Sequence, residues 1–238
     1  MKLVSSIKEK DSTVSFLSAI AQAYSKLGDS QKGQQTLSQA LKITNSIENE
    51  YSKASSLSLI AQAYGKLGDS QKEKQVLLQA LKIARSIERE DIKVGVLSTI
   101  VQASSNLGGS QKGRQRQVLS QALELANSIE NKYGKAISLS EIAQSYFDLG
   151  DRDQAKTLLD DVVRVIDASS NQSFSLLDSK MALLYAEFGN WGEALHLAQR
   201  CYHEDKIAVF VRILQVHAEQ QQPEFKALRD WQEEEEEE

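Results

Sequence analysis

The chain has 238 residues, of which 41% are hydrophobic and 26% charged, and its formal net charge at pH 7 is −5. This composition is typical of a soluble chain with enough apolar residues for a core, and the acidic balance argues against nucleic-acid binding. The single cysteine, Cys201, cannot form an internal disulfide, and no stretch approaches the roughly 18 apolar residues that a membrane helix requires. We therefore expect a cytoplasmic protein that binds neither membranes nor nucleic acid.

The chain repeats itself at an interval of about 40 residues. The stretch LGDSQK at 27–32 recurs unchanged at 67–72, and related stretches follow at 107–112 (LGGSQK) and 149–154 (LGDRDQ). Residues 6–45 and 46–85, aligned on this stretch, are identical at 25 of 40 positions. Such a period is typical of a solenoid. We expect one domain over residues 1–238, with repeats at 6–45, 46–85, 86–127, 128–167 and 168–202.

Each repeat contains two apolar stripes at helical spacing. In the second repeat the first stripe is Leu57, Ile60, Ala61 and Tyr64, and the second is Leu77, Ala80, Leu81, Ala84 and Ile87. Gly68 lies between the stripes and can adopt the left-handed conformation that ends a helix, after which Asp69 or Ser70 can cap the next helix. Each repeat is therefore predicted to be a helix hairpin, and we expect segments such as SIENE (46–50) to lengthen its second helix.

The order of a small residue, a tyrosine, Gly-Asp and a second small residue resembles the tetratricopeptide repeat. The fourth repeat matches at Ile142, Ala143, Tyr146, Gly150, Asp151, Ala155 and Leu159, and the fifth at Met181, Ala182, Tyr185, Gly189, Asn190, Trp191, Ala194 and Ala198. The resemblance covers about residues 10–202 and implies an all-α, right-handed solenoid of stacked antiparallel hairpins. The period is about 40 instead of the family's 34, and the closing proline is absent, so HEAT and armadillo repeats stay as the alternative fold.

The two ends differ from the repeats. Residues 3–12 align with the end of a second helix, which predicts either a shortened capping helix or a piece of a longer array. Residues 205–222 predict a further first helix, and Pro223 suits the start of a last helix through about Trp231. We expect residues 203–232 to form a helical cap and the six glutamates at 233–238 to form a solvated acidic tail.

The sequence offers no catalytic or metal site. GDSQKG at 28–33 and GGSQKG at 108–113 lack the final lysine and serine or threonine of a phosphate loop, and they follow a helix where a phosphate loop follows a strand. His196, His203, His217 and Cys201 lack the close spacing of zinc ligands, and Cys201 lies at a buried repeat position. We expect no enzyme activity, no cofactor and no metal.

Recurring polar residues are the candidate binding site. In tetratricopeptide proteins the first helix of each hairpin lines the concave groove, and the resemblance places three columns of residues there. The glutamine column is Gln22, Gln62, Gln102 and Gln144; the serine column is Ser18, Ser58, Ser98, Ser140 and Ser179; the charged column is Lys26, Lys66, Asn106, Asp148 and Glu187. A glutamine amide donates and accepts hydrogen bonds, so the column can bind a peptide backbone. The alternative is that these are solvated positions copied by duplication.

These features predict a scaffold or adaptor that binds a partner polypeptide along the concave groove. The alternatives are a regulatory or sensor array belonging to a larger effector and, less favoured by the acidic composition, an RNA-binding helical repeat. Self-association through the open ends of the solenoid is a further possibility. A two-residue insertion in the third repeat coincides with a basic cluster, Lys112, Arg114 and Arg116, which is either an exposed turn or a contact site.

Overall fold

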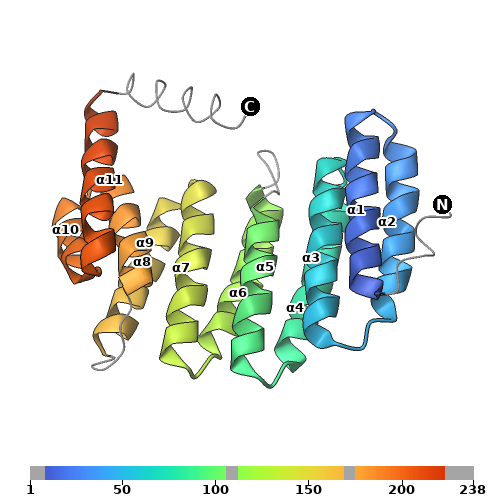
Figure 1. Ribbon diagram of the computed structural model, residues 1–238, viewed down its shortest axis with the longest axis horizontal. Coiled ribbons are helices and arrows are strands. Elements are labelled where there is room, and N and C mark those ends of the chain that lie inside the picture. The colour runs from blue at the N-terminus through green and yellow to red at the C-terminus, as the bar shows by residue number, and fades with distance from the viewer. Residues whose placement is uncertain (1–8, 106–111, 169–174, 223–238) are drawn as a thin grey trace. The chain divides into compact units, whose positions relative to one another are not determined.

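A computed structural model describes residues 9–105, 112–168 and 175–222, and every regular element within them is an α-helix. The helices, labelled in Figure 1, are α1 (Lys10–Lys26), α2 (Ser30–Asn45), α3 (Glu50–Lys66), α4 (Ser70–Ser86), α5 (Glu90–Ser104), α6 (Lys112–Asn127), α7 (Lys132–Asp148), α8 (Arg152–Asp167), α9 (Ser175–Glu187), α10 (Trp191–Arg200) and α11 (His203–Gln221). The prediction of an all-α fold is confirmed. None of these helices is long and apolar enough to cross a membrane.

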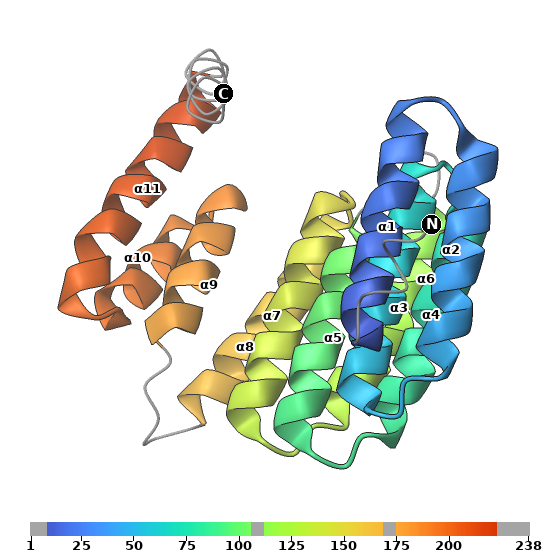
Figure 2. The same cartoon turned by 45° about the vertical axis from the view of Figure 1, so that its right-hand side comes forward.

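The chain divides into two compact units, Met1–Val165 and Ile166–Glu238, which are described separately. In the first unit, α1 packs against α2, α3 against α4 and α5 against α6 as hairpins, and α1, α3, α5 and α7 pack in succession. Figures 1 and 2 show these four helices side by side in one layer, with α2, α4 and α6 in a second layer. This is the stacked-hairpin architecture of an α-solenoid.

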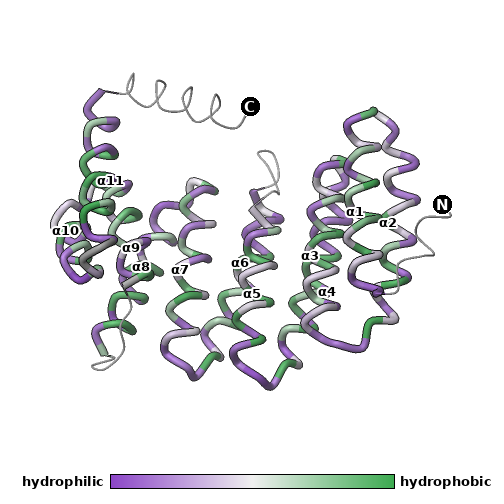
Figure 3. The backbone as a smooth tube through the Cα atoms, viewed as in Figure 1, coloured by the Kyte–Doolittle hydropathy of each residue, from purple (hydrophilic) through white to green (hydrophobic). Residues whose placement is uncertain are grey.

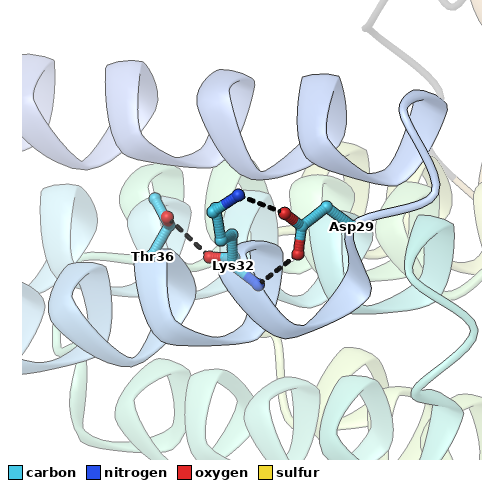
Figure 4. A network of polar contacts seen from close by, with 3 residues as sticks. All are labelled: Asp29, Lys32 and Thr36. Carbon is cyan, nitrogen blue, oxygen red and sulfur yellow. Dashed lines mark hydrogen bonds and ion pairs between the residues drawn. The ribbon is translucent and has the colours of Figure 1, made fainter.

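The turn within each hairpin has the geometry that its sequence predicts. Gly28, Gly68 and Gly150 have φ of 75°, 78° and 82°, in the left-handed region that ends a helix. Asp69 then caps α4, because its side chain accepts a hydrogen bond from the backbone N–H of Lys72 at 3.1 Å. In the first hairpin Asp29 caps α2 in the same way and also pairs with the Lys32 ammonium, while Thr36 bonds the Lys32 carbonyl (Figure 4).

The link between successive hairpins differs from the prediction. Residues 46–50 do not lengthen the second helix: α2 ends at Asn45, and the next helix begins at Glu50. The helix stops because Ile47 turns into the core, with 6% of its surface exposed, and the Asn49 side chain accepts the Ser52 N–H at 2.9 Å to cap α3. Segments such as SIENE therefore connect one repeat to the next.

The core follows the predicted stripes. All nine residues named from periodicity are buried: Leu57, Ile60, Ala61, Tyr64, Leu77, Ala80, Leu81, Ala84 and, directly after α4, Ile87. Figure 3 shows hydrophobic and hydrophilic positions alternating along the helices, as expected for helices that each bury one side. Burial of these stripes between neighbouring hairpins is the main stabilising contribution in a stack of this kind.

The second unit contains α9, α10 and α11, and α9 packs against both of the others. Gly189, with φ of 79°, forms the turn between α9 and α10. The predicted helix at 205–222 is present as α11, and Cys201 is buried as predicted. The Trp191 and His217 rings meet edge to face, with centroids 4.7 Å apart. The expected last helix with Pro223 and Trp231, the acidic tail, and most of the segment 3–12 lie outside the described residues, and the single-domain assignment remains a prediction.

Candidate protein-interaction surface

The glutamine column lies on the solvent side of the layer formed by α1, α3, α5 and α7, a surface we call the A face. Gln22 in α1 and Gln62 in α3 are half-buried, and Gln102 in α5 and Gln144 in α7 are exposed. Because these helices pack in succession, one position repeated in each brings the four amides into a row across the layer. The structure thus brings together the glutamines that the sequence predicted as a column.

The four amides differ in what they bind within the chain. The Gln22 Oε1 accepts a hydrogen bond from the Lys66 ammonium at 2.9 Å, and the Gln144 Nε2 donates to the Asp148 carboxylate at 2.8 Å. Within the described residues, the side-chain amides of Gln62 and Gln102 make no hydrogen bond. The centre of the column therefore has unused donors and acceptors, while its two ends are engaged by neighbouring side chains.

The charged column lies at the C-terminal ends of the same helices. Lys26, Lys66 and Asp148 are exposed, so this edge of the A face is basic on α1 and α3 and acidic on α7. The Ser25 hydroxyl also donates to the Lys66 carbonyl at 2.6 Å, which ties α1 to α3 at this edge. Asn106 lies outside the described residues, and Glu187 belongs to the second unit.

The serine column lies mostly beneath the surface. Ser18, Ser58 and Ser140 are only 3%, 3% and 4% exposed, and the hydroxyls of Ser58 and Ser140 donate to carbonyls of their own helices. Ser98 is half-buried and donates to the Glu141 carboxylate at 2.8 Å, which links α5 to α7. Small side chains at this position allow adjacent helices to approach, so these serines occupy a packing position, and their role in binding remains a prediction. Ser179, in α9, belongs to the second unit.

Two tyrosines and a leucine on the A face were not anticipated. Tyr51 and Leu59 in α3 and Tyr133 in α7 are 45%, 38% and 37% exposed. Gly95 in α5 leaves room beside Tyr51, whose Cε2 lies 3.6 Å from where a Cβ of residue 95 would be. The signal was in the sequence: both tyrosines lie eleven residues before a column glutamine, or about three helical turns along the same side of the helix.

The basic cluster of the third repeat is engaged in part by the fold. The Arg116 guanidinium pairs with the Asp151 carboxylate at 3.0 Å, and the Lys112 ammonium lies 3.6 Å from where a Cβ of Gly150 would be. These two residues therefore cover the turn of the next hairpin. Residues 106–111, which precede Lys112, lie outside the described residues.

The described residues contain no obvious chemical centre. They hold no group of three or more metal-binding side chains. Cys201 is buried, its thiol donates to the Leu197 carbonyl at 3.6 Å, and burial raises the pKa of the thiol. A buried thiol with a raised pKa is a poor nucleophile.

Two family models described as tetratricopeptide repeat match the chain, one over residues 12–86 and the other over residues 138–165. No curated protein matches it. Similar solved structures include TPR-like repeats of a putative kinesin light chain from Podosopora anserina, with 22% identity, 85% of this chain and 97% of that chain covered, and a TM-score of 0.47. Others are Ton1535 from Thermococcus onnurineus NA1 (15% identity, 90% and 73% covered, TM-score 0.47) and BtubC from P. vanneervenii (17% identity, 90% and 83% covered, TM-score 0.45).

Proposed function

We propose that the chain, which matches tetratricopeptide-repeat models over residues 12–86 and 138–165, is a scaffold that binds a partner polypeptide along the A face and catalyses no reaction itself. The observation that supports this proposal most directly is the pair of unused amides, Gln62 and Gln102, at the centre of a row of four. Each amide can donate to a peptide carbonyl and accept from a peptide N–H.

The spacing of the helices suits an extended chain. Packed helices lie about 8–10 Å apart, and an extended peptide advances about 3.3 Å per residue. A peptide that crosses α3 and α5 would therefore meet a new column position about every three residues. Tyr51, Leu59 and Tyr133 would supply apolar contacts, and tyrosine is over-represented among residues that dominate binding energy. Lys26 and Lys66 would favour acidic partner residues near the C-terminal ends of α1 and α3.

Photo-cross-linking of the intact chain tests the location of the partner. A photoreactive residue placed at Gln62 or Gln102 is expected to cross-link the partner from a cell extract, and one placed at Lys72, at the start of α4, is expected not to. Mass spectrometry of the cross-linked product would identify the partner. Cross-links confined to position 72 would contradict the proposal, and a cross-linked RNA in place of a protein would favour the nucleic-acid alternative.

A further inference from the structure

The side chain of Glu73 is buried without a hydrogen-bond partner. It lies in the first turn of α4, is 1% exposed, and neither carboxyl oxygen has a partner within the described residues. A Cβ at Gly65, in the last turn of α3, would lie 2.6 Å from Oε1 and 2.8 Å from Oε2. The carboxyl group therefore packs directly against the backbone of α3, in the space that the absence of a side chain at Gly65 provides.

This arrangement distinguishes the second repeat from the others. The positions equivalent to 65 and 73 are Ser25 and Gly33 in the first repeat and Phe147 and Ala155 in the fourth. In the third repeat they are Ser105 and the buried Gln115, because the two-residue insertion shifts the start of α6 to Lys112. In each repeat at least one of the two residues is small, but only the second repeat places an ionisable group there. In the first repeat Leu67, which directly follows α3, lies over Gly33, with its Cδ2 2.6 Å from where a Cβ would be.

The charged groups on the surrounding helices do not compensate Glu73. Lys66 follows Gly65 in α3, but its ammonium bonds Gln22. In α5 the charged residues lie in and near the first turn, at the opposite end of the helix from Ser104, and α6 begins with Lys112, Arg114 and Arg116. None of these charged groups shifts the pKa of the Glu73 carboxyl. Burial alone raises this pKa from 4.5 to about 7.

We propose that Glu73 is a proton-controlled latch of the α3–α4 hairpin that regulates the A face. The protonated side chain stays packed against Gly65. The carboxylate has no partner there, and since an unpaired buried charge is costly, it leaves for water and separates the last turn of α3 from the first turn of α4.

The effect on the A face rests on the proposed function. It follows from the contacts of Lys66, the residue next to Gly65. Lys66 joins α3 to α1 through its ammonium, which bonds Gln22 at 2.9 Å, and through its carbonyl, which accepts from Ser25 at 2.6 Å. Movement of the last turn of α3 would disturb both bonds and shift Lys66 on the A face. Partner binding is then stronger below about pH 7 than above it.

Hydrogen exchange of the intact chain without a partner tests the latch. After correction for intrinsic exchange rates, amides at 62–76 are expected to open about 30-fold more often at pH 8.5 than at pH 5.5, which is the linkage expected for a carboxyl whose pKa falls from about 7 to 4.5 on opening. Glu73→Gln should remove this dependence. Glu124→Gln, at an exposed carboxylate, should keep it. Unchanged pH dependence in Glu73→Gln, or no pH dependence in the natural chain, would overturn the latch.

A second variant keeps the test decisive if the Glu73→Gln chain fails to fold. Gly65→Ser combined with Glu73→Gly recreates the pair found in the first repeat, and it should fold and exchange independently of pH over this range. Because the exchange experiment contains no partner, its result does not depend on the proposed function. Partner binding through the A face with equal affinity at pH 5.5 and 8.5 would overturn the regulatory role alone.

Discussion

Glu90, the first residue of α5, holds the cap of the next hairpin: its carboxylate accepts a hydrogen bond from the backbone N–H of Asn131 at 2.9 Å. The same carboxylate accepts the Glu130 N–H at 2.7 Å. Asn131 in turn caps α7 by accepting the Gly134 N–H at 2.8 Å. The contact therefore joins the start of one repeat to the start of the following one.

This contact predicts a loss of stability in acid. The two N–H groups lower the pKa of the Glu90 carboxyl, so the folded chain holds this proton less tightly than the unfolded chain does. The stabilisation is present above the usual carboxyl pKa, about 4.3, and is lost as the pH falls through the lower folded value. Glu90→Ala should therefore lower the urea midpoint at pH 7 and differ little from the natural chain at about pH 2. An equal difference at both pH values would contradict this account.

The fit between Gly65 and Glu73 predicts that two substitutions compensate one another. Gly65→Ser places a side chain in the space that the Glu73 carboxyl occupies, and we expect it to lower the free energy of unfolding by about 1–3 kcal/mol. In the Glu73→Gly background the same serine should cost little, because the first repeat contains this pair. A double-mutant cycle by urea unfolding measures the coupling, and an additive cycle would show that the two residues do not share one space.

The turn glycine Gly68 predicts a third result. Its φ of 78° is strained for a β-branched residue, so Gly68→Val should lower the free energy of unfolding by about 1 kcal/mol or more. Gly192 is a matched control because it lies in helix α10 without a positive φ, and a Cβ there would touch nothing within 4 Å. Gly192→Ala should instead raise stability by up to about 1 kcal/mol. Similar effects of the two substitutions in thermal unfolding would contradict the role of Gly68.

Features that repeat were predictable from the sequence. The hairpins, the turn glycines and the buried stripe that ends at Tyr64 occur in several copies, and each depends on residues close together in the chain. The sequence also placed the column glutamines on one layer, because the repeat itself fixes their positions in successive helices.

Features that depend on contacts between repeats were not predictable in the same way. The burial of Ser58 depends on how closely neighbouring helices approach, and the role of Glu90 depends on the backbone of a loop about forty residues away. The packing of Glu73 could have been suspected, because a charged residue replaces glycine at that repeat position, but the space at Gly65 is visible only in three dimensions.

The last prediction concerns the A face. Because Gln22 and Gln144 already bond within the chain, the central amides should contribute most to partner binding. Each hydrogen bond contributes about 0.5–1.5 kcal/mol net, so Gln62→Ala with Gln102→Ala should weaken binding by about 5- to 150-fold, and Tyr51→Ala should weaken it further. Helix stability should hardly change, because alanine favours helix.

The matched control changes residues in the second layer of helices. Lys32→Ala with Lys72→Ala changes two exposed residues at the starts of α2 and α4, and partner affinity should stay within a few-fold of that of the natural chain. Titration calorimetry with the cross-linked partner, once identified, measures both variants, and circular dichroism checks that both remain helical. If the lysine variant loses the partner while the glutamine variant binds normally, the unused amides of Gln62 and Gln102 have no role in recognition. The partner then binds the layer of α2 and α4 instead of the A face.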